Sequence, residues 1–245
     1  MLQVQSGEVW SDGGHTEFVA DRWSELAPWY DELVMSGSAS HTAALSLMNE
    51  LLPDFVEPEV LDVACGQGLA TRALAEAGAK ATGTDVAPGM LEIARRRSPT
   101  LEFIEDDAQR LGAFEDVSFD GLTCQLGLMD IPDLGAAVRS MHRVLRPNGW
   151  CVLVIGHPAF LAPGGQETVG DDGLRGRLIV RYLREEFWRT DNPNGVRGRA
   201  GNYHRPLSTY LNTLIRAGFR LDATSEAATP GSEVPAFFGA RLRRS

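Results

Sequence analysis

The sequence has little lysine and no long apolar run. Lys80 is the only lysine among 23 basic residues, and the formal net charge is −10. An acidic chain of this kind disfavours a broad phosphate-binding face, so we expect no nucleic-acid partner. No stretch approaches the roughly 20 apolar residues that cross a bilayer, which excludes a membrane-spanning helix. Residues 1–14 have neither the basic start nor the apolar core of a signal peptide, and a cytoplasmic location is therefore expected.

Cysteine is also scarce. Cys65, Cys124 and Cys151 each lie in or just after an apolar run, where a free cysteine behaves as a small buried hydrophobe. No pair has the spacing of a zinc site. The sequence therefore predicts neither a disulfide framework nor a metal site.

Apolar segments alternate regularly with helical patterns in the middle of the chain. Strands are predicted at 60–64, 80–84, 101–105, 119–125 and 150–156, and helices at 69–77, 88–97 and 133–146. A helix capped by Ser208 and ending at Ala217, followed by strands at 219–223 and 236–243, completes the pattern. Such alternation predicts parallel βαβ units in an α/β, doubly wound, mostly parallel seven-stranded sheet.

Two regions depart from this alternation. Residues 1–53 are aromatic and polar, with a helix predicted from about Thr16 to Leu33 that is interrupted near Pro28, and another from His41 to Leu52. Residues 54–245 form the predicted core. The core contains an insert at about 157–205, which is rich in Gly, Pro and Arg and has a weak helical piece at 178–187.

A glycine-containing turn follows the first predicted strand. The segment Leu61-Asp62-Val63-Ala64-Cys65-Gly66-Gln67-Gly68 leads directly into a helix. Glycines at such a turn allow a ligand to approach the backbone, and the helix N-terminus presents unpaired N–H groups. An NAD fingerprint would need a third glycine where Thr71 stands. The spacing instead matches D-x-A/G-x-G-x-G.

Acidic residues follow the next two strands. Asp85 ends the second strand, nineteen residues after Gly66, where a carboxylate can accept both hydroxyls of a ribose. The third strand is followed by Asp107 and Ala108. A carboxylate and a backbone amide there can address the exocyclic amine and a ring nitrogen of adenine.

These segments resemble motif I, the following acid and motif II of the class I S-adenosylmethionine-dependent methyltransferases, especially the ubiquinone/menaquinone-type small-molecule group. Residues 144–150, Val-Leu-Arg-Pro-Asn-Gly-Trp, are similar to the family's L-x-P-G-G segment, with Asn148 in place of the first glycine. The resemblance covers roughly residues 20–245. It implies a Rossmann-like fold, an N-terminal helical lid and S-adenosylmethionine as cofactor.

The resemblance also implies a set of cofactor contacts. Gly66 and Gly68 would contact the methionine moiety, Asp85 the ribose, and Asp107 and Ala108 the adenine. Gln125 and Leu126 would lie near the sulfonium. The complete predicted cofactor set is Tyr30, Asp62, Ala64, Gly66, Gly68, Asp85, Val86, Met90, Asp107, Ala108, Gln125 and Leu126.

Two histidines are candidates for a general base, because an imidazole with a pKa near 6.5 suits proton removal at neutral pH. His157 directly follows the fifth strand, and the alternative is a loop histidine bonded to the backbone. His204 precedes the last helix. Trp29, Tyr203 and Arg205 are predicted to line the substrate pocket, with Tyr203 as a wall and Trp29 as cover. Arginines of the insert that faced the pocket would favour an anionic substrate.

The sequence therefore predicts an enzyme that methylates a small molecule at O or N, a secondary metabolite or cofactor precursor. Methylation of a peptide or an RNA nucleotide is a second hypothesis. The N/D-P-P-Y motif of many base-nitrogen methyltransferases is missing, since residues 124–127 read Cys-Gln-Leu-Gly. From other classes, an NAD-linked oxidoreductase and a non-catalytic cofactor-binding partner subunit stay open. The oligomeric state is not predicted.

Overall fold

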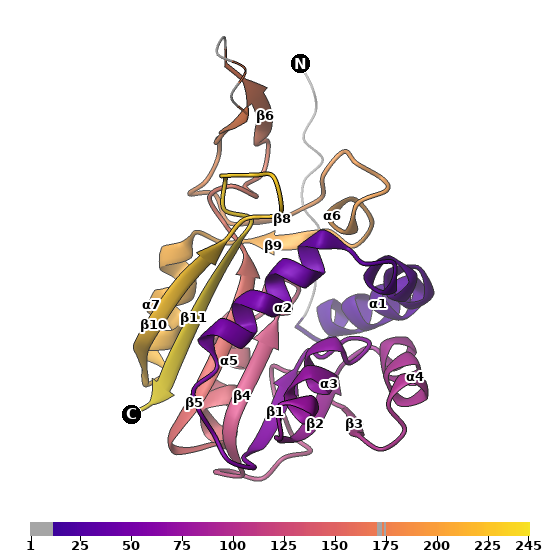
Figure 1. The fold of residues 1–245 in the computed structure, drawn as a ribbon, viewed down its shortest axis with the longest axis vertical. Coiled ribbons are helices and arrows are strands. Elements are labelled where there is room, and N and C mark those ends of the chain that lie inside the picture. Colours follow the sequence, from indigo (N-terminus) through magenta and orange to yellow (C-terminus); the bar gives the residue numbers. More distant parts are fainter. Residues whose placement is uncertain (1–11, 171–172, 174) are drawn as a thin grey trace.

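The computed structural model describes residues 12–170, 173 and 175–245 (Figure 1). Within these ranges, seven strands form one sheet in the order β10-β11-β5-β4-β1-β2-β3. From β5 to β3 all neighbours pair in parallel, whereas β11 runs antiparallel to both β5 and β10. The predicted doubly wound, mostly parallel seven-stranded sheet is confirmed. The strands are β1 (Glu59–Val63), β2 (Lys80–Asp85), β3 (Glu102–Glu105), β4 (Phe119–Gln125), β5 (Leu145–Gly156), β10 (Phe219–Ala227) and β11 (Phe237–Arg244).

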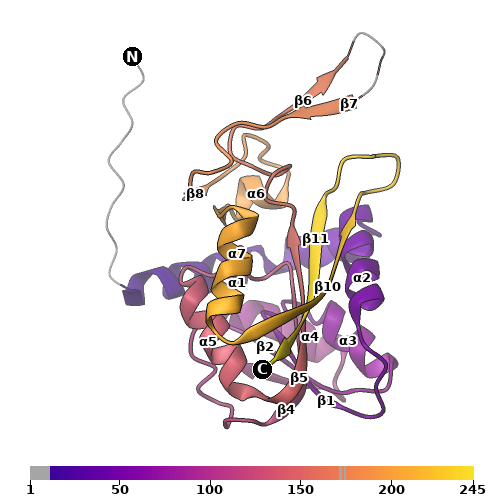
Figure 2. The same cartoon turned by 90° about the vertical axis from the view of Figure 1, so that its left-hand side faces the viewer.

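Helices cover both faces of this sheet, which makes it the middle of three layers (Figure 2). On one face lie α2 (Ala39–Leu51) and α3 (Leu69–Glu76), and on the other α5 (Leu134–Val144) and α7 (Leu207–Arg216). Along β5, Val152 and Val154 belong to the core on the α2 and α3 side, while Leu153 belongs to the core on the α5 side. Parallel strands covered on both faces are apolar throughout, which is why β5 reads as an unbroken apolar run. No helix in the described ranges is long and apolar enough to span a bilayer.

The first helix is longer than predicted. α1 (Asp12–Met35) continues through Pro28, so the predicted interruption is wrong. A proline inside a helix removes the hydrogen bond to the carbonyl four residues earlier, here that of Ser24. The helix packs at this point against α4 (Pro88–Arg97), where Gly89 N donates to Ser24 Oγ at 3.2 Å. Tertiary packing therefore holds the helix together where the local sequence favours a break.

The insert contains short strands where a helix was predicted. β6 (Gln166–Val169) pairs with β7 (Arg175–Leu178), and this hairpin projects away from the sheet in Figure 2. β8 (Glu186–Trp188) pairs with β9 (Asn202–His204). The helical piece predicted at 178–187 is therefore wrong, because its ends are held in strand pairs by partners up to eighteen residues away. Within the insert, α6 (Val196–Arg199) is the short helix between β8 and β9.

The last helix begins two residues earlier than predicted. Pro206 occupies the N-cap position of α7, and its carbonyl accepts from Thr209 N at 2.9 Å, so the predicted cap by Ser208 is wrong. Proline suits the start of a helix because its φ is already near −65°, here −57°. The predicted division at residue 53 and the limits of the insert stay predictions.

Candidate active site

A cavity opens at the carboxyl ends of the parallel strands. It encloses about 990 Å³, part of it open to solvent, and its walls include the segments that follow β1, β2, β3 and β4. The chain runs from β1 towards β2 and β3 on one side and places β4 and β5 on the other, so strand order reverses at β1. Ligands of open α/β sheets bind at such a switch point.

The turn after β1 leaves room for a ligand. A Cβ added to Gly66 would meet nothing within 4 Å, and Gly66 has a left-handed φ of 54°. The neighbouring Gln67 is buried, lines the cavity, and has an Nε2 without a hydrogen-bond partner. Gly68 does not line the cavity, because its Cβ position lies 3.0 Å from the Phe103 ring. In this structure Gly68 forms the turn, with φ of 82°, and its predicted cofactor contact stays a prediction.

Asp85 faces the cavity from the end of β2. Its Oδ2 accepts from Gly66 N at 2.8 Å and its Oδ1 from Ala87 N at 2.9 Å. These bonds fix the orientation of the carboxylate and occupy one acceptor position on each oxygen. Burial raises the pKa of Asp85, and its backbone hydrogen bonds oppose that shift. A carboxylate oxygen can accept more than one hydrogen bond, so the remaining acceptor positions suit the hydroxyls of a ribose.

Asp62 supports the turn from below. Its Oδ2 accepts from Thr71 Oγ1 at 2.7 Å and its Oδ1 from Thr123 Oγ1 at 2.8 Å. The side chain thereby joins β1 to α3 and to β4. Burial raises the pKa of Asp62 to about 6, although both hydrogen bonds favour the charged form. Asp62 lines the cavity, and in this structure both of its carboxylate oxygens hold the surrounding elements in place.

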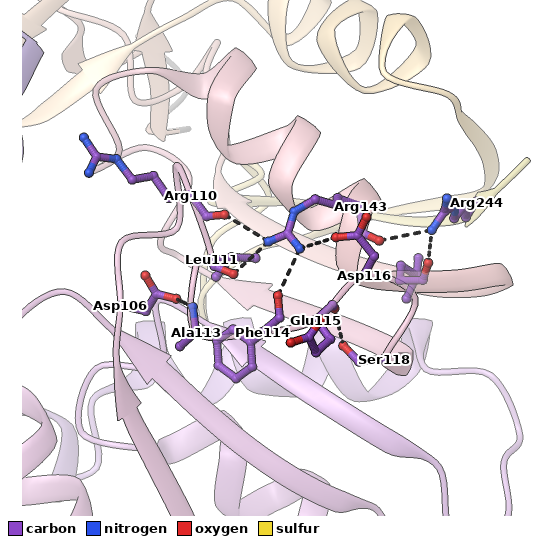
Figure 3. Close-up of polar contacts among 11 residues, drawn as sticks. Asp106, Arg110, Leu111, Ala113, Phe114, Glu115, Asp116, Ser118, Arg143 and Arg244 are labelled. Atoms are coloured by element: carbon purple, nitrogen blue, oxygen red, sulfur yellow. Dashed lines mark hydrogen bonds and ion pairs between the residues drawn. The ribbon is translucent and has the colours of Figure 1, made fainter.

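The loop after β3 is held by Arg143 of α5 (Figure 3). Its guanidinium donates to the carbonyls of Arg110, Leu111 and Phe114 and pairs with Asp116 at 2.6 Å. The loop also carries Asp106, Asp107, Ala108 and Gln109, all of which line the cavity. Because one side chain bonds several points of this loop, the cavity wall that the loop forms is fixed before any ligand arrives.

The segment after β4 contains strained backbone. Leu126 lines the cavity with φ of 60°, and Ala64 lies opposite with φ of 56°. A left-handed conformation is costly for a residue with a side chain, so the surrounding structure must hold both residues in it. Gly127 lets the backbone after β4 approach Ala64 closely, since a Cβ at Gly127 would lie only 2.5 Å from the Cβ of Ala64. Gln125, the last residue of β4, also lines the cavity.

The N-terminal helices close the opposite side. The residues of α1 that line the cavity lie on one helical face with spacings of four, seven and four, and they are Val19, Trp23, Tyr30 and Val34. From α2, His41 lines the same wall, and its Nε2 lies 2.9 Å from Tyr30 Oη. Its Nδ1 lies 2.8 Å from Ser38 Oγ. Burial is the main cause that lowers the pKa of His41 to about 4.

The depressed pKa of His41 predicts a pH-dependent stability. An unfolded histidine has its ordinary pKa of 6.5, so the unfolded state takes up the proton first as the pH falls. We expect wild-type protein to lose stability relative to a His41→Gln variant between about pH 6.5 and about pH 4, by roughly 2 to 3 kcal/mol. Urea unfolding of both proteins across this range measures the difference. A stability difference that stayed constant with pH would contradict the prediction, whatever its absolute size.

An ion pair lies at the edge of the cavity. Asp130 lines the cavity, and its Oδ1 lies 2.6 Å from Nη1 of Arg197 in α6. The Arg197 guanidinium also contacts the sulfur of Met129 and donates to the Gly201 carbonyl at 3.2 Å. Burial raises the pKa of Asp130 to about 6, and Arg197 opposes this shift. Arg197 itself lines a second, smaller cavity under the insert.

The two histidines predicted as bases lie outside the first cavity. His157 accepts from Ala159 N on Nδ1 at 3.3 Å, and its Nε2 lies 2.7 Å from Glu226 Oε1. Both ring nitrogens of His157 are thus engaged, which agrees with the alternative of a loop histidine bonded to the backbone. His204 lines the second cavity, where its Nε2 bonds the Tyr182 carbonyl at 2.8 Å. Their roles as general bases stay predictions, and these contacts do not support that of His157.

The predicted pocket residues also separate from the first cavity. Tyr203 and Arg205 line the second cavity. Arg205 is buried, and its guanidinium donates to the carbonyls of Leu128, Ile131 and Pro132, so much of its bonding capacity holds the backbone after β4. Trp29 lines neither cavity, and Arg199 stacks on its ring at 4.3 Å.

The first cavity brings together eleven of the twelve predicted cofactor residues, all except Gly68. The sequence interpretation missed Trp23, His41, Gln67 and Asp130. Trp23 and His41, which belong to the N-terminal helices, could have been found from the helical spacing of apolar and aromatic residues. Asp130 gave no such signal, because its partner Arg197 is 67 residues away in the chain.

Comparison with known proteins agrees with this geometry. Residues 61–153 match the family described as "Methyltransferase domain". The crystal structure of an S-adenosylmethionine-dependent methyltransferase from Mesorhizobium loti resembles this fold with a TM-score of 0.71. The match covers 85% of this chain and 99% of that chain, and the two sequences are 27% identical. Residues 61–153 are thus similar to a methyltransferase domain, and the fold around them resembles that of S-adenosylmethionine-dependent methyltransferases.

Curated relatives match part of this chain. A demethylmenaquinone methyltransferase from Chlorobaculum tepidum is 35% identical over 143 residues, which are 56% of this chain and 58% of the relative. A ubiquinone biosynthesis O-methyltransferase from Albidiferax ferrireducens is 34% identical over 137 residues, 54% of this chain and 52% of the relative. The chain thus spans little more than half the length of the curated relatives it matches.

Proposed function

We propose that this protein transfers the methyl group of S-adenosylmethionine to an O or N atom of a small molecule, a secondary metabolite or a cofactor precursor. The observation that carries the proposal is the Asp85 carboxylate, held by Gly66 N and Ala87 N and facing a cavity at the switch point of the sheet. The quinone-precursor methyltransferases among its relatives support a small-molecule acceptor.

The cavity residues fit an adenosyl cofactor. Asp85 would hold the ribose, and Asp107 with the Ala108 amide would hold the adenine. The open turn at Gly66 would admit the methionine moiety, and Gln67 Nε2, which has no partner in the structure, could donate to it. Gly68, Val86 and Met90 complete the predicted contacts, with Val86 and Met90 on the cavity wall.

When bound, S-adenosylmethionine supplies a sulfonium methyl carbon already activated for in-line displacement, so the protein's task is alignment and exclusion of water. Positioning alone can contribute roughly 7 kcal/mol to lowering a barrier. The aromatic face of α1, with Trp23 and Tyr30, would cover the cavity, while Gln125 and Leu126 would bound the sulfonium end. We keep His204 as the proposed base for acceptors that must lose a proton, because it lines the second cavity together with Arg197.

Binding of S-adenosylhomocysteine tests the proposal. We expect a one-to-one complex by isothermal titration calorimetry at micromolar concentration, because the carboxylate and the loop amides are already in place. The absence of binding at a few hundred micromolar would defeat the proposal. A parallel fluorescence titration with NADH tests the oxidoreductase alternative, for which we expect no saturable signal.

The remaining assignments are supported less directly. A reducing, cytoplasmic location is consistent with the three free, buried cysteines. The acidic net charge supports the proposal that nucleic acid is not a partner. A non-catalytic cofactor-binding subunit would bind S-adenosylhomocysteine equally well. An assay with S-adenosylmethionine and small-molecule acceptors distinguishes the two, because such a subunit would transfer no methyl group.

A further inference from the structure

A second cavity lies under the insert, next to the proposed cofactor site. It encloses about 440 Å³, part of it open to solvent, between β8, β9 and the end of β5. Figure 1 shows β8 and β9 crossing above the carboxyl end of the main sheet. The two cavities adjoin at the ion pair described above, because Asp130 lines the first and Arg197 lines the second. A molecule in the second cavity would therefore be a neighbour of the cofactor.

The lining of the second cavity is cationic. It includes Arg177, Arg197 and Arg205, and no carboxylate. Arg197 is neutralised by Asp130, and Arg205 is bonded to backbone carbonyls. No described carboxylate lies within ion-pair distance of Arg177. The charge of Arg177 is thus not neutralised by any described carboxylate.

Three polar atoms of the wall are buried without a hydrogen-bond partner. They are Arg177 Nε, Trp188 Nε1 and Asn202 Oδ1. Asn202 is only 8% exposed, so water reaches it poorly. A buried polar atom without a partner costs about 1 to 3 kcal/mol, and native proteins retain few of them. Three around one cavity indicate a ligand that completes their hydrogen bonds.

The chemistry of these atoms defines the ligand. Arg177 Nε and Trp188 Nε1 are donors only, and together with a positive charge they suit a carboxylate. Asn202 Oδ1 is an acceptor and suits an O–H or N–H group on the same molecule. The remaining wall is apolar and aromatic, with Leu161 and Tyr210, which favours a flat organic body.

We propose that the second cavity binds the carboxylate of the methyl acceptor, a small aromatic or unsaturated organic acid, through Arg177 and Trp188. This inference rests on the proposed function, because it assigns the acceptor to a place beside the cofactor. Met129, Asp130 and Arg197 form the boundary across which the acceptor faces the first cavity.

Benzoate and benzamide are matched probes for this subsite. They have the same shape and differ in charge, so their affinities for the full-length protein, measured by calorimetry, isolate the contribution of the cation. We expect benzoate to bind at least about tenfold more tightly than benzamide, a difference of 1.4 kcal/mol. Equal affinities, or no benzoate binding at millimolar concentration, would overturn the proposal.

Variants locate the binding. Arg177→Gln is expected to weaken benzoate about tenfold. Arg181→Gln removes the same charge from an exposed position of the same insert and should leave benzoate binding unchanged. Trp188→Phe keeps the aromatic ring, removes one N–H donor, and is expected to weaken benzoate several-fold and to abolish any quenching of tryptophan fluorescence by benzoate. Benzoate binding that was insensitive to both Arg177→Gln and Trp188→Phe would overturn the assignment.

S-adenosylhomocysteine binding by the same variants separates the two proposals. The expected result is an unchanged affinity for S-adenosylhomocysteine in Arg177→Gln, together with the loss of benzoate. If wild-type protein binds S-adenosylhomocysteine but benzoate shows no preference over benzamide, the proposed function stands and the acceptor subsite is overturned. If S-adenosylhomocysteine does not bind, the proposed function fails, and the acceptor role of the second cavity fails with it.

Discussion

An Asp85→Ala variant is expected to lose at least about 100-fold in affinity for S-adenosylhomocysteine. The carboxylate would accept hydrogen bonds from both ribose hydroxyls, and each hydrogen bond to a charged group is worth about 1.5 to 3 kcal/mol. Two such bonds correspond to more than two powers of ten in the dissociation constant. Calorimetric titration of wild type and variant measures the loss. Asp85→Asn, which retains one acceptor oxygen, should give an intermediate affinity.

Glu105→Gln is the matched control for this experiment. Glu105 pairs in register with Asp85 at the end of the adjacent strand β3, but it is exposed and does not line the cavity. The Glu105→Gln substitution removes the same charge at the same edge of the sheet, and its effect on the affinity for S-adenosylhomocysteine should be less than twofold because Glu105 lies outside the cavity. If Asp85→Ala bound S-adenosylhomocysteine as tightly as Glu105→Gln does, the ribose assignment would be wrong, and the proposed function would lose its main support.

The second large effect is on stability. Arg205→Met is expected to lower the free energy of unfolding by about 3 kcal/mol, because three carbonyls of the segment after β4 lose their donor. Those carbonyls belong to Leu128, Ile131 and Pro132, and Arg205 is only 7% exposed. Methionine fills a similar volume, so the loss reports the hydrogen bonds more than a cavity. Urea unfolding at neutral pH gives the measurement.

The same experiment separates two roles for Arg205. Sequence reasoning placed it in the substrate pocket, whereas its contacts predict that it mainly holds the backbone beside both cavities. Arg205→Lys retains the charge but cannot reach several carbonyls with a planar fork, so it should recover only part of the lost stability. The exposed Arg181→Gln variant is expected to change stability by less than about 0.5 kcal/mol. An Arg205→Met protein as stable as Arg181→Gln would show that the carbonyl contacts contribute nothing.

The cofactor half of the site was predictable because its determinants are local in the chain. Most of the predicted contact residues lie at the end of a strand or in the turn that follows it, and parallel strands bring those ends to one edge. Asp62, Gly66 and Asp85 therefore converge once the strands are recognised. The alternation of strands and helices identifies those strands, since a sheet covered on both faces requires apolar runs that can be read directly.

The lid and the insert were predicted less well because their structure depends on distant partners. The packing of α1 against α4 keeps Pro28 inside a helix, and pairing with β9 makes Phe187 part of a strand. Neither effect has a signature within the segments themselves. Local propensity is a weak guide wherever tertiary contacts contribute more free energy than the backbone preference does.

From the sequence alone follow the sheet, the glycine turn and the carboxylate at the end of β2, because period and spacing encode them over short distances. The class of cofactor came from the resemblance to a methyltransferase family. Only the tertiary structure decided which histidine enters the cofactor cavity, that Arg205 holds backbone, and that Arg177, Trp188 and Asn202 surround a second cavity. These side chains come from elements without a common periodicity. Their meeting depends on how the insert folds over the sheet, and the chain specifies that through long-range packing.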